Sequence, residues 1–283
     1  MVLGHQKQLQ FLKKSAESDR LAHAYLFSGP AQIGKKTIAK EWASRLLGEN
    51  VQSAIQPDLI LLEPDPESGE IEIGQIRELI WKLSLKPAAA ALKVAILNDC
   101  HLMNQHAQNC FLKTLEEPKG DTVLILVTDR PRVLLPTIAS RCQEIKFYPV
   151  ARKEIDKYLL QAGKSADIAE EIGKIAAGFP GRAIELVEFP EKLNDYRETM
   201  KDIEKILNGS LAARFQYAQK TADREDLLEV LKIWLAYFRN NLISGAGDKK
   251  IKNILLRIQK IFFLLSTTNV SRRLAVEILM LEL

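Results

Sequence analysis

A glycine-rich stretch at residues 29–37 constrains the fold of this chain more than any other part of its sequence. It reads Gly-Pro-Ala-Gln-Ile-Gly-Lys-Lys-Thr and matches the phosphate-binding loop G-x-x-x-x-G-K-[ST] up to Lys35. An apolar run at residues 24–27 precedes it, and residues 37–47 carry apolar side chains at helical spacing. Glycine and proline also mark ordinary turns. Because strand, glycine-rich loop and helix follow in the order that the motif requires, we predict an α/β fold built around a phosphate loop.

The residue that follows Lys35 departs from this motif. A Ser or Thr hydroxyl at that position would hold Mg²⁺, whereas the sequence has Lys36. Two unit charges about 4 Å apart at an effective dielectric of about 20 interact by roughly 4 kcal/mol, so the ammonium group would repel the metal. Thr37 brings a hydroxyl one residue later, but one residue along a helix turns a side chain by about 100°. We therefore predict that Thr37 is a poor substitute.

A second departure lies at the end of the apolar run at residues 93–97. Nucleoside triphosphatases carry there a carboxylate that holds Mg²⁺ and, beside it, a Glu that activates the attacking water. This chain has Asn98 and Asp99 at these positions, a pair that alone would indicate only a strand-ending turn. Because Lys36 and Asn98 weaken the same metal site independently, we predict a degenerate site that holds no metal.

The residues leave open whether nucleotide still binds the loop. Gly29, Gly34 and Lys35 keep the phosphate cradle, and Thr37 keeps a hydroxyl at the start of the helix. In an intact loop Lys35 would bind phosphate. In an inactive loop it would be a solvated charge that the helix dipole disfavours. We expect no cofactor to be required, with binding of ATP or ADP as the open alternative.

Residues 1–149 alternate strand-like and helix-like runs, which is the pattern of an α/β core with a mostly parallel sheet. The expected strands are Ala24–Phe27, Asp58–Glu63, Lys93–Leu97, Val123–Thr128 and Glu144–Phe147. The runs at residues 59–62, 94–97 and 123–127 are continuously apolar, which predicts strands covered on both faces.

Strand signals stop near residue 150. We predict a small helical domain at residues 150–190 and an all-helical domain at residues 191–283, with a plain loop at residues 244–248. Trp81 and Trp234 are expected to be core residues. His101 and His106 are expected to be packing or surface residues without chemistry.

Composition narrows the class of protein. The chain has 283 residues, of which 47% are hydrophobic, enough for two or three domains with cores of their own. No apolar run approaches the roughly 18 residues of a membrane span, and the first residues lack the apolar stretch of a secretion signal, so we expect a cytoplasmic protein without a membrane partner. Three cysteines without C-x-x-C spacing argue against disulfides and zinc. The net charge of +4 decides little about contact with DNA.

Four segments carry further motifs: residues 23–30, residues 107–118 (AQNCFLKTLEEP), residues 135–142 with the run Ser-Arg-Cys, and residues 269–277. Together these segments resemble bacterial clamp-loader subunits, which belong to the AAA+ class. Residues 107–118 are similar to the N-A-L-L-K-T-L-E-E-P run of that family, and residues 23–30 to its approach to the phosphate loop. Residues 135–142 match its Ser-Arg-Cys motif, and residues 269–277 resemble the last helix of its collar domain. The resemblance covers nearly the whole chain. It implies an AAA+ phosphate-loop core at residues 1–149, followed by a helical lid and a helical collar.

The resemblance also implies partners and roles. The collar and the AAA+ faces would join this chain to ATPase subunits and a delta-type subunit in a hetero-oligomeric ring that loads a sliding clamp onto primed DNA. Arg141, supported by Ser140, would act in trans on the ATP of a neighbouring subunit. Thr128 would stand at the strand end that senses the terminal phosphate. The plain alternative for Arg141 is an arginine that bonds carbonyl groups at the end of a short helix.

Two positions depart from the family pattern. In the lid motif at residues 178–183, Gly181 stands where ATPase subunits carry a sensor arginine and Arg182 follows it, so the role of Arg182 stays open. Many relatives carry a cysteine zinc module between the positions of Leu47 and Pro57, and this chain has no cysteine there. Zinc is therefore expected to be absent.

Our leading hypothesis is a subunit of the DNA polymerase III clamp loader without ATPase activity of its own. One alternative is an active AAA+ ATPase of the same or a related complex, in which Thr37 and Asp99 restore catalysis. A more distant alternative is a stand-alone DNA-binding protein, which the mild basicity would permit.

Overall fold

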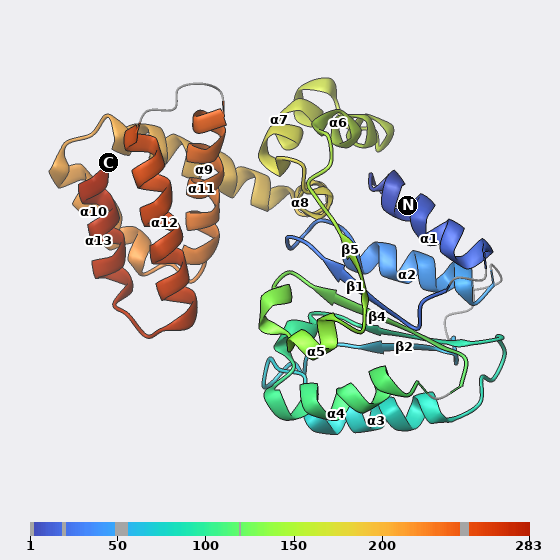
Figure 1. The fold of residues 1–283 in the computed structure, drawn as a ribbon. Helices are drawn as coiled ribbons and strands as arrows, with labels where there is room; N and C mark the ends of the chain where they lie inside the picture. The colour runs from blue at the N-terminus through green and yellow to red at the C-terminus, as the bar shows by residue number, and fades with distance from the viewer. Residues whose placement is uncertain (1–2, 19–20, 49–55, 119, 244–248) are drawn as a thin grey trace. The chain divides into compact units, whose positions relative to one another are not determined.

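The computed structural model describes residues 3–18, 21–48, 56–118, 120–243 and 249–283. The chain packs as two compact units, residues 1–184 and residues 185–283 (Figure 1). Each unit has a core of its own. The division of the chain into core, lid and collar at the predicted boundaries stays a prediction.

A five-stranded parallel sheet in the order β2-β3-β4-β1-β5 forms the centre of the first unit. Its strands are β1 (Ala24–Ser28), β2 (Leu59–Leu62), β3 (Lys93–Leu97), β4 (Thr122–Thr128) and β5 (Gln143–Lys146). The α/β fold and the predicted strands are therefore confirmed, each strand to within one residue at either end. Ser28 lies opposite Thr128 and Leu97 opposite Leu126, so the carboxyl ends of the three central strands meet at one edge of the sheet.

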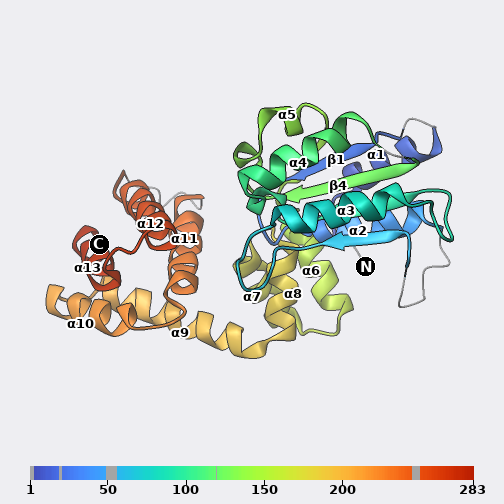
Figure 2. The same ribbon diagram turned by 90° about the horizontal axis from the view of Figure 1, so that it is seen from below.

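Helices cover both faces of this sheet (Figures 1 and 2). On one face lie α1 (Gln6–Glu17) and α2 (Lys35–Leu46), over a core that includes Trp42. On the other face α3 (Ile73–Ser84) and α4 (Gln105–Glu116) lie side by side. The apolar strands supply side chains to both cores, as expected for a sheet between two helical layers.

Two expectations about burial in this unit are wrong. Strand β2 is an edge strand, so its apolar run is not covered on both faces, and Leu61 is 40% exposed. Trp81 is 60% exposed rather than in the core. It follows Ile80 directly, and one residue along a helix turns the side chain away from the buried stripe of α3.

Asp58 ties the start of β2 to the segment that leads into β3. Its carboxylate accepts hydrogen bonds from the backbone N–H groups of Ala88, Ala89 and Ala90 at 2.7–2.8 Å. Burial raises the pKa of this carboxyl group, but the three N–H groups and the nearby Lys93 outweigh burial and hold its pKa below the ordinary value.

Three short helical turns and the longer helices α6, α7 and α8 complete the first unit. They are η1 (Cys100–Leu102), η2 (Pro131–Val133), α5 (Pro136–Ala139), α6 (Arg152–Gln161), α7 (Ala166–Ala176) and α8 (Pro180–Glu188), whose second half belongs to the other unit. Within the first unit, α6 packs on α7.

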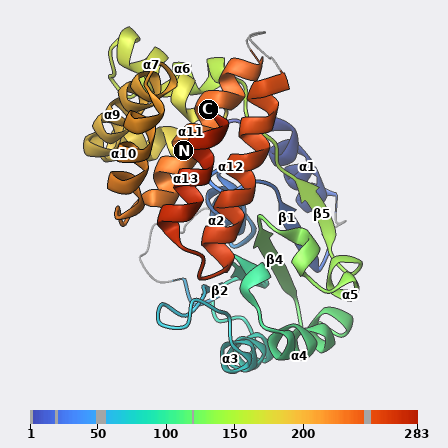
Figure 3. The ribbon, with the colours of Figure 1, turned by 90° about the vertical axis from the view of Figure 1, so that its left-hand side faces the viewer.

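Every regular element that the structure describes in the second unit is a helix. They are α9 (Pro190–Leu207), α10 (Leu211–Ala222), α11 (Leu227–Ile243), α12 (Lys249–Thr267) and α13 (Arg272–Glu282). Helices α11, α12 and α13 pack next to one another (Figure 3), around a core that holds Trp234 and Leu279. The prediction that Trp234 is a core residue is confirmed. The loop predicted at residues 244–248 lies outside the described residues. No helix in the described part of the chain is long and apolar enough to cross a membrane.

Candidate functional site

The glycine-rich loop connects β1 to α2 at the carboxyl edge of the sheet, as predicted. Both of its glycines are needed for its path. Gly29 has a φ of 149°, and a Cβ atom there would lie 2.5 Å from the carbonyl oxygen of Phe147. Gly34 caps α2 with a φ of 93°, in the left-handed region that side chains disfavour.

Lys35 is turned back onto its own loop. Its side chain is buried, with 6% of the residue exposed. The Nζ atom donates hydrogen bonds to the carbonyl oxygens of Gly29 at 2.7 Å and Pro30 at 2.6 Å. Burial lowers the pKa of Lys35, and the carboxylates of Asp129 and Asp99 partly oppose this. The ammonium group of Lys35 is thus bonded within its own loop.

Two contacts from distant segments hold the tip of the loop. The Nε2 atom of His5 lies 2.9 Å from the carbonyl oxygen of Ile33 in a buried hydrogen bond. The backbone N–H of Gly181, at the start of α8, donates to the carbonyl oxygen of Gln32 at 2.8 Å. A Cβ atom on Gly181 would lie 2.7 Å from that same oxygen. The lid motif therefore contacts the loop through Gly181, and the role of Arg182 stays open.

The predicted metal positions are occupied by groups that suit a cation poorly. Lys36 forms an ion pair with Glu63, just beyond the end of β2. The amide of Asn98 donates to a carboxylate oxygen of Asp99 at 2.9 Å. Thr37 lies within α2 and is exposed, so the helical geometry that makes it a poor substitute is present. These donors do not fit a magnesium ion, because an ammonium and a neutral amide replace the hydroxyl and the carboxylate.

No group of three or more His, Cys, Asp or Glu side chains is arranged to hold a metal ion in the part of the chain that the structure describes. The stretch without cysteines between Leu47 and Pro57, on which the expectation about zinc rests, lies mostly outside the described residues, at residues 49–55.

His101 joins the ends of β3 and β4, a position that we did not predict to be functional. Its Nδ1 atom is hydrogen-bonded to the hydroxyl of Thr128 at 3.2 Å, and its Nε2 atom lies 3.3 Å from a carboxylate oxygen of Asp129. Burial lowers the pKa of His101, and Asp129 opposes this. The sequence did contain a signal for this contact, because Thr128 ends the buried strand β4 and His101 shortly follows the neighbouring buried strand β3. Thr128 is itself fully buried and also accepts the N–H of Arg130.

Arg141 lies just after α5, on the surface of the first unit. Its Nη1 atom donates to the carbonyl oxygen of Thr137 at 3.0 Å, and its Nη2 atom donates to Oε1 of Glu116 at 2.6 Å. The hydroxyl of Ser140 donates to the same Thr137 carbonyl at 3.2 Å. The side chain of Arg141 is 35% exposed. The carbonyl contact that the plain alternative predicts is therefore present, and a glutamate contact accompanies it.

Sequence comparisons place the chain in a family. The family model described as "DNA polymerase III, delta subunit" matches residues 4–151. The DNA polymerase III subunit delta' of Pseudomonas aeruginosa is 34% identical over 211 residues, which cover 68% of this chain and 63% of that protein. The subunit delta' of Bacillus subtilis is 31% identical over 212 residues, which cover 70% of this chain and 62% of that protein. The chain thus spans somewhat less than two thirds of the length of these relatives.

Two solved structures have a similar fold. A DNA polymerase III gamma subunit-related protein of Thermotoga maritima superposes with a TM-score of 0.60 at 23% identity and covers 97% of each chain. The Holliday junction branch migration motor RuvB of Thermotoga maritima superposes with a TM-score of 0.54 at 16% identity, over 96% of this chain and 87% of RuvB. At these identities the likeness concerns the fold alone. The family model and the two delta' relatives carry the assignment: this chain belongs to the DNA polymerase III delta' subunit family, as the resemblance to bacterial clamp-loader subunits led us to expect.

Proposed function

We propose that the chain is a subunit of the DNA polymerase III clamp loader that does not hydrolyse ATP itself and helps to load the sliding clamp onto primed DNA. Membership of the delta' family supports this role. Its similarity to a tau/gamma subunit of Haemophilus influenzae, 27% identical over 269 residues, supports an evolutionary relation to subunits that would be its partners in a ring. A delta-type subunit completes the proposed complex.

The observation that carries the proposal is the position of Lys35. In the working motif this lysine reaches the terminal phosphates of the nucleotide. Here its ammonium group is buried and bonded to the carbonyls of Gly29 and Pro30. Phosphate binding would have to break both bonds at a site where Lys36 and Asn98 replace the metal-holding groups. Neither feature favours hydrolysis.

Arg141 is the residue through which the chain would act on ATP. A guanidinium group that reaches the transferring phosphoryl group of another subunit stabilises its charge, an effect worth about 10³–10⁵ in rate in GTPases. Arg141 lies at the surface, where a neighbouring subunit has access to it. We propose that Arg141 completes the ATP site of a neighbouring ATPase subunit and that Ser140 supports it from the same turn.

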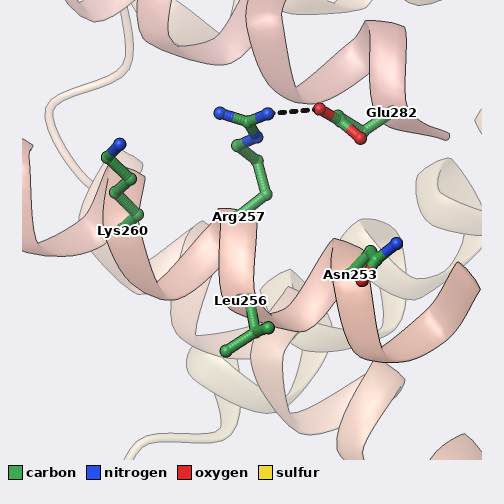
Figure 4. A pocket seen from close by; sticks show the side chains of 5 residues that line it. All are labelled: Asn253, Leu256, Arg257, Lys260 and Glu282. Carbon is green, nitrogen blue, oxygen red and sulfur yellow. Dashed lines mark hydrogen bonds and ion pairs between the residues drawn. The ribbon is translucent and has the colours of Figure 1, made fainter. Parts of the chain in front are cut away.

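The helices of the second unit offer a surface for assembly. Large apolar side chains are exposed on α12 and α13 at Leu256, Phe263, Leu274, Ile278 and Leu281. A pocket of about 290 Å³ on the same two helices is lined by Asn253, Leu256, Arg257, Lys260 and Glu282 (Figure 4). Exposed apolar patches with polar rims mark sites of protein contact. We propose that this surface joins the collars of the complex.

Two measurements test the proposal. The isolated chain should show no Mg²⁺-dependent ATP turnover above background; robust turnover that Lys35→Ala abolishes would establish the active-ATPase alternative instead. In a loader reconstituted with the ATPase and delta-type subunits, Arg141→Ala should lower DNA-stimulated ATP hydrolysis by at least tenfold and leave assembly intact. Arg132→Ala, which removes another exposed arginine of the same region, is the matched control. Unchanged hydrolysis with Arg141→Ala would exclude the role in trans.

A further inference from the structure

We infer that Glu116 holds the side chain of Arg141 in an ion-paired position, here called the parked position. Glu116 thereby sets how readily the arginine leaves this position to bind a polyphosphate. This inference rests on the proposed role of Arg141 in trans and adds a residue that regulates it. Glu116 touches neither nucleotide nor phosphate in this scheme, so it is a positioning residue.

The geometry shows how the arginine is held. Two terminal nitrogens of the guanidinium group are engaged by two separate segments, Nη1 by the Thr137 carbonyl of α5 and Nη2 by the Glu116 carboxylate at the end of α4. The carbonyl contact is local, because Thr137 lies only four residues before Arg141 in the same turn. The contact with Glu116 comes from another helix and fixes the direction of the guanidinium group.

Electrostatics explain why the pair forms. Glu116 is the last residue of α4, and Glu117 caps the same helix end. The carbonyl end of a helix carries partial negative charge, which disfavours carboxylates and favours cations. Arg141 therefore neutralises a place that would otherwise hold two carboxylates beside the negative end of a helix.

The same electrostatics explain why release is possible. Both side chains of the pair are partly exposed, and exposed ion pairs are weak. A polyphosphate of a neighbouring subunit carries several negative charges, so it competes effectively with one carboxylate for the guanidinium group. Removing the charge of residue 116 should favour the released arginine by up to about fivefold, the factor that corresponds to the upper end, about 1 kcal/mol, of an exposed ion pair.

The test uses the reconstituted loader with Glu116→Gln, which keeps the size and polarity of the side chain and removes its charge. At sub-saturating ATP we expect hydrolysis to rise two- to fivefold over wild type. Glu117→Gln, which neutralises the adjacent exposed carboxylate, is the matched control and should leave the rate within a factor of about 1.5. The gain should vanish in Glu116→Gln/Arg141→Ala, because coupled residues lose their effects together.

The outcomes separate this inference from the proposed function. If Arg141→Ala leaves hydrolysis unchanged, the role in trans fails. If Arg141→Ala lowers hydrolysis but Glu116→Gln leaves it unchanged or lowers it, the role in trans stands and the parked position is refuted. A gain from Glu116→Gln that persists without Arg141 also refutes it, since Glu116 would then act through another group.

Discussion

Replacing Lys35 with alanine should destabilise the protein in the absence of any nucleotide. In a loop whose lysine waits for phosphate, the substitution would mainly weaken nucleotide binding. Here the ammonium group is buried and bonds two carbonyls of its own loop, so the folded chain itself depends on it. The stability of the chain therefore distinguishes the two states of the loop.

The magnitude follows from these contacts. A hydrogen bond with a charged donor contributes about 1.5–3 kcal/mol, and two are lost. Desolvation of the ammonium group, which lowers its pKa, offsets part of this contribution. We expect a net loss of about 2–4 kcal/mol in the free energy of unfolding of the first unit. For a unit of this size, 1 kcal/mol shifts Tm by roughly 2–4 °C, which gives a decrease of roughly 5–15 °C.

Scanning calorimetry of the full chain without nucleotide measures this shift. Lys36→Ala is the matched control. It removes the neighbouring lysine, whose ion pair with Glu63 is partly exposed, and should lower Tm by about 4 °C or less. A Tm for Lys35→Ala within about 1 °C of wild type would refute the buried role of Lys35. So would an ATP-dependent rise in Tm that wild type shows and Lys35→Ala lacks.

Three further predictions concern stability. Asp58→Asn should cost about 2–3 kcal/mol of unfolding free energy at pH 7. Because the folded pKa of Asp58 is lowered, the stability that its charge contributes is present above the unfolded pKa and is lost as pH falls through the folded pKa. Urea unfolding should therefore show the stabilities of the two proteins converging below about pH 4. Gly181→Ala places a methyl group against the carbonyl of Gln32 and should cost about 1–3 kcal/mol; the same urea titration would contradict this if the variant matched wild type. Trp81→Ala should change unfolding free energy by less than about 0.5 kcal/mol, whereas Trp234→Ala should cost about 3–5 kcal/mol, and equal losses would show that Trp81 is buried in solution.

The sequence predicted the sheet well because four of its five strands are mostly apolar runs. The burial of individual side chains was predicted less well where it depends on neighbouring strands and helices. The run at residues 59–62 resembles a central strand, and its place at the sheet edge depends on the order of strands, which no local pattern encodes. Trp81 is different, because the buried residues of α3, which are Ile76, Leu79 and Leu83, recur at helical spacing and Trp81 lies off that face.

The candidate site could be predicted in its residue types but not in its contacts. Spacing identified the loop and the two weakened metal positions, and the resemblance to clamp-loader subunits pointed to Arg141. The bonds that Lys35 makes to its own loop depend on backbone angles, and those of His5 and Gly181 join segments far apart in the sequence. The partnership of Arg141 and Glu116 likewise depends on how α4 and α5 pack.

At the glycine-rich loop of the first unit, hydrogen bonds hold three parts of the chain together. His5 brings in the segment before α1, Lys35 the start of α2, and Gly181 the start of α8. Each of these hydrogen bonds joins two groups of the chain itself. Because these bonds are internal to the first unit, the segment before α1, the loop and the start of α8 should keep the same arrangement with and without nucleotide.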